Sequence, residues 1–265
     1  MKKQFAISGE ILFLTIICYF VMYLVGGLWF MGTDLLLTDN FFINVLLKQS
    51  SFLIVAIAAF FLVKIYKLPF SISLHFRVFI ISYLTTFSIY LIFALILSLF
   101  KVLNIQFHAL SVQAIEHLIL FCFFPSLFIA IGEEFLFRFF LLKKMISFLK
   151  PITAIFFSSF IFAFGHFRFE FHSFIFLFVF GIFVSIVYLK TEMLTLAISI
   201  HAAWNFAQYF LYTDSSDFSY LGIRLISVEK INQHLYDWSE TILLLVLITS
   251  FALYKNKINI RTSYQ

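Results

Sequence analysis

Charged residues are scarce in this sequence. Only 12% of its 265 residues are charged and 63% are hydrophobic, whereas soluble domains have roughly 25% and 45–50%. The mean hydropathy of +1.06 is correspondingly high. These values exclude a soluble globular protein. They predict an all-α fold in which a polytopic bundle of helices crosses a membrane, with the lipid bilayer as a partner.

Basic clusters are missing as well. The 18 Lys and Arg residues give a net charge of +5, but they are scattered in ones to threes between apolar runs. A nucleic-acid site would need basic residues gathered on one surface, so we expect no nucleic-acid partner. Scattered cations between apolar runs are instead typical of the loops of a membrane protein.

Cysteine is represented by two residues, Cys18 and Cys122, and both fall inside apolar runs. Two thiols are too few for a thiolate zinc site, and we expect no disulfide between them. The zinc motif H-E-x-x-H and the serine-hydrolase motif G-x-S-x-G are also absent. The common arrangements of zinc proteases and serine hydrolases are therefore excluded.

No repeat and no Gly/Ser-rich linker divides the chain, so we expect residues 1–265 to form a single transmembrane domain. No cleavable signal is evident either. Lys2 and Lys3 precede an apolar run, Ile11–Met31, that has about the 20 residues of a spanning helix. We expect this run to be retained as the first span.

Apolar runs predict about eight spans. The fifth, sixth and eighth are short, which leaves a seven-span variant open. The predicted spans are Ile11–Met31, Val45–Tyr66, Val78–Phe100, Leu118–Leu142, Pro151–Phe167, Phe174–Leu189, Leu194–Tyr212 and Thr241–Tyr254.

The distribution of basic residues predicts the orientation. With eight spans and a cytoplasmic N-terminus, twelve Lys and Arg residues lie inside and five outside, and Arg138 within a span completes the 18. This bias favours both termini inside. We expect Thr213–Ser239 to be an extracytoplasmic loop with some helix of its own. We expect Asp34–Asn44 and Lys101–Glu116 to be loop-like or interfacial.

Three charged side chains lie inside the fourth span: Glu133, Glu134 and Arg138. Each charge at the centre of a bilayer costs roughly 2.5–3.5 kcal/mol on insertion scales, so their presence points to a site. Glu134 and Arg138 are spaced i,i+4 and can pair on one helix face. Glu133 lies about 100° round the helix, so its carboxylate is free to point elsewhere.

Two further spans carry polar groups that lipid would reject. His166 lies near the end of the fifth span, and His201 and Asn205 share one face of the seventh. A single buried histidine or a Glu–Arg pair is often only structural. The combination on three spans is instead typical of catalysis or ion transport, so we expect a functional site.

The chemistry of these groups suits hydrolysis. A buried Glu can act as a general base on water, and neutral His can hold that water or bind a metal. Asn and His can donate hydrogen bonds to a developing oxyanion. Glu133, His166 and His201 would also satisfy a three-ligand catalytic zinc, so the cofactor is either none or Zn²⁺.

The pattern Glu133-Glu134-x-x-x-Arg138, Phe162-x-x-x-His166 and His201-x-x-x-Asn205 resembles the motif set of the CAAX protease and bacteriocin-processing (CPBP, or Abi) family of intramembrane proteases. That family includes type II CAAX prenyl endopeptidases and lysostaphin-resistance-like proteins. The similar core covers residues 117–212. The resemblance implies an eight-helix core that opens to one membrane face.

The resemblance also implies roles for these residues. Glu133 would activate water, His166 would help to hold it, and His201 with Asn205 would form the oxyanion hole. Glu134 and Arg138 would support the site. Whether the family uses a metal is contested, and we favour the metal-free chemistry with zinc as the alternative.

Substrates implied by the resemblance are peptides or membrane-associated proteins, with or without a lipid, and bacteriocin-type peptides. The compact chain is like the bacterial members, so we expect a multi-pass protein of a bacterial plasma membrane. Two other functions stay open. One is a non-catalytic bacteriocin-immunity protein, and the other is an ion-coupled transporter with a proton relay; the absence of inverted repeats argues against the transporter.

Overall fold

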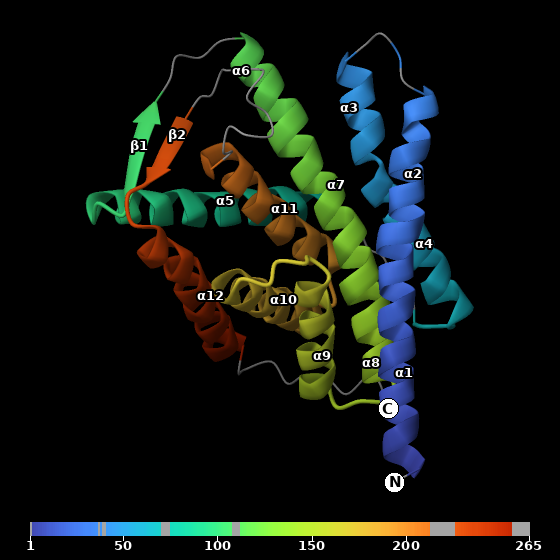
Figure 1. Ribbon diagram of the computed structural model, residues 1–265. Helices are drawn as coiled ribbons and strands as arrows, with labels where there is room; N and C mark the ends of the chain where they lie inside the picture. Colours follow the sequence, from blue (N-terminus) through green and yellow to red (C-terminus); the bar gives the residue numbers. More distant parts are fainter. Residues whose placement is uncertain are drawn as a thin grey trace.

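The computed structural model describes residues 2–36, 38, 41–69, 75–107, 112–212 and 226–255. Helices dominate them (Figure 1). The helices are α1 (Lys2–Tyr19), α2 (Gly26–Gly32), α3 (Phe41–Gln49), α4 (Ser51–Ile65), α5 (Phe76–Leu99), α6 (Val112–His117), α7 (Phe124–Glu133), α8 (Lys143–Ile146), α9 (Pro151–Phe164), α10 (Phe171–Thr191), α11 (Leu194–Tyr212) and α12 (Gln233–Lys255); the strands are β1 (Leu103–Phe107) and β2 (Ile226–Lys230).

Five helical segments among the described residues are long and apolar enough to cross a membrane. They coincide with the predicted first, second, third, fourth and sixth spans. The predicted fifth span is a shorter apolar helix, α9. A multi-pass all-α bundle is therefore supported, while the total of eight and the orientation stay predictions. The five segments are Ile7–Leu36, Ile43–Ile65, Phe76–Leu99, Leu118–Ile146 and Phe171–Thr191.

One element was not predicted. Strands β1 and β2 form a two-stranded antiparallel sheet in which Leu103 pairs with Lys230 and Phe107 with Ile226. We expected Lys101–Glu116 to be loop-like and Thr213–Ser239 to be a loop, so both expectations are wrong where these strands form. The predicted outer loop also contains the first residues of α12, which begins at Gln233, and residues 213–225 lie outside the described residues.

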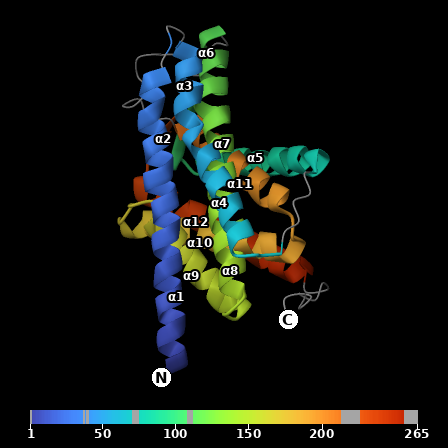
Figure 2. The same ribbon diagram turned by 90° about the vertical axis from the view of Figure 1, so that its right-hand side faces the viewer.

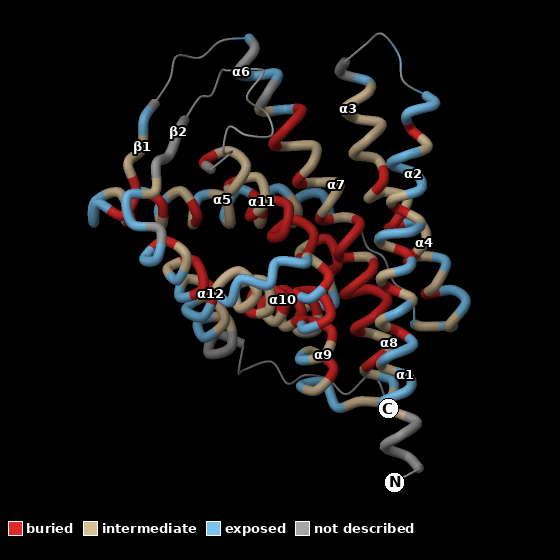
Figure 3. Tube along the Cα trace, viewed as in Figure 1, coloured by how far each residue is buried: buried red, intermediate tan, exposed pale blue. Residues whose placement is uncertain are grey.

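The bundle has α7 at its centre. Helix α7 packs against α4 on one side and α11 on the other, while α10 packs against α9 and α12. Buried residues concentrate along α7 and the helices around it (Figure 3). Two views at right angles show α1 and α7 along the long axis of the molecule, with α5 lying across them (Figures 1 and 2).

Close contact between α4 and α7 depends on Gly132. A Cβ at this position would lie 2.6 Å from the backbone carbonyl oxygen of Phe52, which is closer than real Cβ atoms come. Small residues at helix interfaces in membranes allow such backbone approach. The next residue along α7 is Glu133, so this contact fixes the depth and rotation of the carboxylate.

Candidate active site

The two adjacent glutamates stand where the helix changes its winding. Residues 112–146 form one continuous helical run, with α7 ending at Glu133 and a π-helical segment extending from Glu134 to Leu142. Wider turns of this kind occur often at functional sites. Nearly every residue of the segment is buried, so the two carboxylates lie inside the protein.

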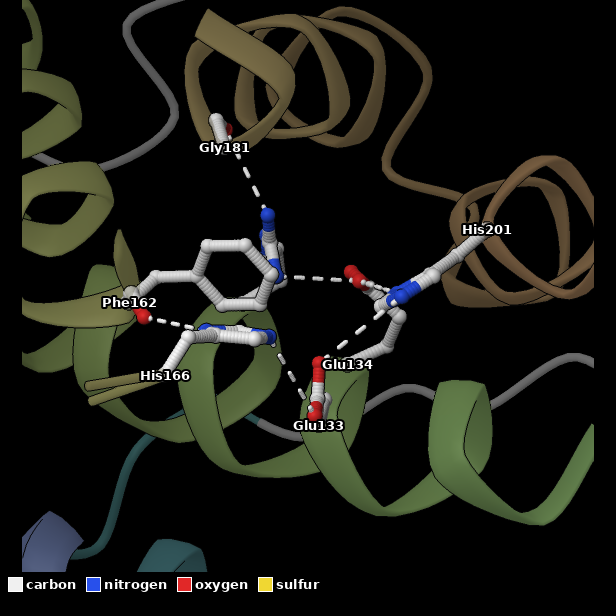
Figure 4. A network of polar contacts seen from close by, with 7 residues as sticks. Glu133, Glu134, Phe162, His166, Gly181 and His201 are labelled. Carbon is white, nitrogen blue, oxygen red and sulfur yellow. Dashed lines mark hydrogen bonds and ion pairs between the residues drawn. The ribbon is translucent and has the colours of Figure 1, made fainter. Parts of the chain in front are cut away.

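Glu134 is held from two sides (Figure 4). Its Oε1 lies 2.9 Å from Nη1 of Arg138, the predicted i,i+4 pair, and 2.7 Å from Nδ1 of His201. The guanidinium also stacks on the Phe162 ring at 4.4 Å, and its Nη2 lies 3.5 Å from the Gly181 carbonyl oxygen. Glu134 and Arg138 are at most 1% exposed, so this ion pair is sealed from solvent.

Glu133 faces the two histidines instead. Its Oε1 lies 3.8 Å from Nε2 of His166, and its Oε2 lies 3.7 Å from Nε2 of His201. Figure 4 shows the carboxylate below both rings, which reach it from α11 and from the end of α9. These separations are too long for direct hydrogen bonds. They suit groups that act together on a small molecule between them, such as water.

The contact made by Nδ1 determines the tautomer of each histidine ring. His166 Nδ1 lies 2.8 Å from the Phe162 carbonyl oxygen, and His201 Nδ1 lies 2.7 Å from the Glu134 carboxylate. Because both oxygens only accept, each Nδ1 carries the hydrogen. A neutral ring then presents a lone pair at Nε2 toward Glu133. Only a charged ring donates there, so oxyanion binding by His201 requires its protonated form.

Asn205 lies one turn beyond His201 on α11, and both line an open cavity of about 480 Å³. Glu133 and His166 line the same cavity. The four residues predicted to be catalytic therefore line the same cavity, and Arg138 and Glu134 lie behind its wall. Other cavity-lining residues come from α10, α11, β2, α12 and the α9–α10 loop, and include Arg168, His172, Trp204, Gln208, Tyr209, Lys230, Asp237 and Glu240.

Glu240 is a buried polar residue that the sequence did not single out. It is 7% exposed, and its carboxylate accepts hydrogen bonds from Tyr90 and Gln208. We expected an outer loop up to Ser239 and the eighth span from about Thr241, which left Glu240 between them, whereas α12 already begins at Gln233. The sequence held one sign of this cluster. Gln208, which donates to Glu240, follows His201 by seven residues and so shares its helix face.

A zinc ion does not fit the residues as they lie. No group of three His, Cys, Asp or Glu side chains within the described ranges is arranged to hold a metal. Two ligands of one tetrahedral zinc would lie about 3.4 Å apart, given bonds near 2.0–2.1 Å. The carboxylate–imidazole separations of 3.7 and 3.8 Å are wider. The mechanism below therefore uses the side chains alone.

Comparison with known proteins agrees with the motif pattern. Residues 115–207, about a third of the chain, match the family of type II CAAX prenyl endopeptidase Rce1-like proteins. No curated protein and no solved structure matches. The matched segment contains every residue of the cluster from Glu133 to Asn205, which supports an endopeptidase at the level of the family. The part of the chain that carries the candidate site is thus similar to Rce1-like proteins, as the motifs predict.

Proposed function

We propose that this protein is an intramembrane endopeptidase that hydrolyses a peptide bond with Glu133 as the general base. The observation that carries this proposal is the position of Glu133. Its two oxygens face Nε2 of His166 and Nε2 of His201 at 3.8 and 3.7 Å, at the wall of an open cavity. A buried base, two imidazoles and access for a substrate are what water-driven acyl transfer needs.

Water activation is the first step. A water molecule between Glu133 and His166 donates one hydrogen to the carboxylate and the other to the lone pair at His166 Nε2. Glu133 takes the first proton as the water oxygen attacks the carbonyl carbon of the substrate. The Phe162 carbonyl holds His166 with this lone pair directed at the site. His166 therefore orients the water.

Oxyanion stabilisation is the second step. As the carbonyl oxygen becomes negative, the side-chain amide of Asn205 and the charged His201 donate hydrogen bonds to it. When the C–N bond breaks, the proton held by Glu133 passes to the leaving amine. Glu134 accepts the hydrogen at His201 Nδ1 and pairs with Arg138, so these two residues hold the His201 ring in position.

The substrate class follows from the family match and from the apolar helices. We propose peptides or membrane-associated proteins, with or without a lipid anchor, or bacteriocin-type peptides. The location that we propose is the plasma membrane of a bacterium, in keeping with the compact chain.

The test is cleavage in proteoliposomes by the wild-type protein and by Glu133→Gln, His166→Ala and His201→Ala. The probes are quenched fluorescent peptides that end in Cys, two aliphatic residues and a final residue, with and without a prenyl group on the Cys. We expect each substitution to abolish cleavage, and Glu10→Gln, a carboxylate paired with Lys144 away from the cavity, to keep it. Unimpaired cleavage by all three site variants would refute the proposal.

A further inference from the structure

Trp204 separates the candidate active site from a second hollow. It follows His201 by three residues on α11 and is 1% exposed. It lines the polar cavity of about 480 Å³ and also an apolar groove of about 430 Å³ between α5, α10, α11 and α12. The indole is therefore a shared wall of the two spaces, and its Nε1 atom is buried within that wall.

The indole nitrogen has no hydrogen-bond partner among the described residues. Buried tryptophan N–H groups usually find one. The rings of Tyr90, Phe176 and Phe180 surround the indole, with centroids 5.0, 6.1 and 5.8 Å from its own. The Tyr90 hydroxyl is itself engaged with Glu240 and Tyr236. The indole is thus fixed in place by packing, with its donor unused.

We infer that Trp204 is a substrate-binding residue whose Nε1–H donates to a backbone carbonyl oxygen of the peptide. This inference rests on the proposed function. A neutral N–H donor in a cavity wall is suited to a neutral acceptor, and peptide carbonyls are the commonest such group in a peptide substrate.

The position of Trp204 along α11 indicates which carbonyl group of the peptide it would contact. Three residues of helix separate Trp204 from His201, a rise of about 4.5 Å, and one residue of an extended peptide covers about 3.3 Å. If His201 and Asn205 hold the scissile carbonyl, Trp204 lies near the neighbouring peptide unit. Its contact is then made equally in the ground state and in the transition state, so the effect falls on KM rather than kcat.

The first experiment replaces one atom. Trp204 is substituted by 3-benzothienylalanine, in which sulfur takes the place of the N–H group with little change in ring shape. Trp29 is substituted in the same way as a control, because its Nε1 donates to Ser50 at 2.8 Å away from the cavity. With the farnesylated peptide as probe, we expect KM to rise roughly three- to tenfold for the Trp204 substitution. The value of kcat should stay within twofold, and the Trp29 variant should match the wild type.

The second experiment does not depend on activity. In the Glu133→Gln protein, ¹⁵N-labelled tryptophan gives an indole N–H resonance for Trp204, assigned through Trp204→Phe. We expect addition of the peptide to shift this resonance downfield.

Unchanged kinetics in the 3-benzothienylalanine protein, together with an unmoved resonance, would overturn this inference while leaving the proposed hydrolysis intact. Failure of the wild-type protein to cleave either peptide would instead overturn the proposed function and this inference with it.

Discussion

Two neighbouring carboxylates on one helix have opposite surroundings. Glu134 contacts a guanidinium and an imidazole at 2.9 and 2.7 Å and is fully buried. Glu133 has no partner closer than 3.7 Å among the ion pairs of the described residues, and it borders the cavity. A cluster of charges in a membrane helix can therefore combine one group that is paired within the protein with one that is left for a substrate.

The largest expected effect is a loss of activity without a loss of stability. Glu133→Gln removes the proposed base without removing volume, so kcat should fall by roughly 10³-fold or more, at the upper part of the range for general bases. The melting temperature in detergent should change little, because Glu133 makes no close contact to lose. Cleavage rates and thermal unfolding of the same preparation measure both.

Glu134→Gln should reduce both stability and activity. It removes the carboxylate that contacts the buried Arg138 guanidinium, and breaking a buried pair costs about 3–5 kcal/mol. We expect a large drop in melting temperature and also a loss of cleavage, since His201 loses the carboxylate at its Nδ1. A protein as stable as the wild type would contradict the role given to this pair.

A double substitution sharpens the distinction. Glu134→Gln with Arg138→Met removes both charges, and apolar replacement of a buried pair is often nearly neutral for stability. The double variant should therefore melt close to the wild type. It should still fail to cleave, because no carboxylate then accepts the hydrogen at His201 Nδ1. Restored cleavage would show that Glu134 serves stability alone.

Gly132→Ala should have a moderate effect. The added methyl would meet the Phe52 carbonyl at 2.6 Å, and such overpacking costs about 1–3 kcal/mol. Relief of this clash would move α7 and with it Glu133, so the cleavage rate should fall together with the stability. Gly27→Ala is the control, since a Cβ there meets nothing within 4 Å. Equal melting temperatures for the two variants would contradict the close approach of α4 and α7.

Metal removal should have the smallest effect. The separations at Glu133 are wider than a shared zinc requires, so dialysis against a chelator should leave the cleavage rate within about twofold, since side-chain chemistry loses nothing on chelation. Metal analysis of the purified protein accompanies the assay. Stoichiometric zinc that is lost together with activity would overturn the metal-free mechanism.

Spacing in the sequence was enough to predict the pair formed by Glu134 and Arg138. The i,i+4 relation of Glu134 and Arg138 survives in the structure at 2.9 Å, even though the segment winds as a π-helix, because four residues bring a side chain back to nearly the same face in either winding. The meeting of Glu133 with His166 and His201 followed from the order of the motifs on separate helices. The five apolar segments followed from length and hydropathy.

Contacts between distant segments were not predictable in this way. The pairing of Leu103–Phe107 with Ile226–Lys230 joins parts of the chain separated by more than a hundred residues. The alternation of apolar and polar residues in Leu103–Phe107 and in Ile226–Glu229 was a local sign of strands, but it does not say which segments pair. Likewise, no spacing rule places the Phe162 ring on Arg138 or buries Glu240 against Tyr90. These depend on how helices pack.

The central claim is that Glu133, and not Glu134, is the carboxylate that reacts. The most direct measurement is chemical rescue in proteoliposomes, with formate added to Glu133→Ala and to Glu134→Ala. The open cavity beside Glu133 admits a small carboxylate, so formate should restore part of the cleavage rate in Glu133→Ala and none in the sealed Glu134→Ala. Rescue of Glu134→Ala alone, or full activity of Glu133→Ala without formate, would contradict the claim.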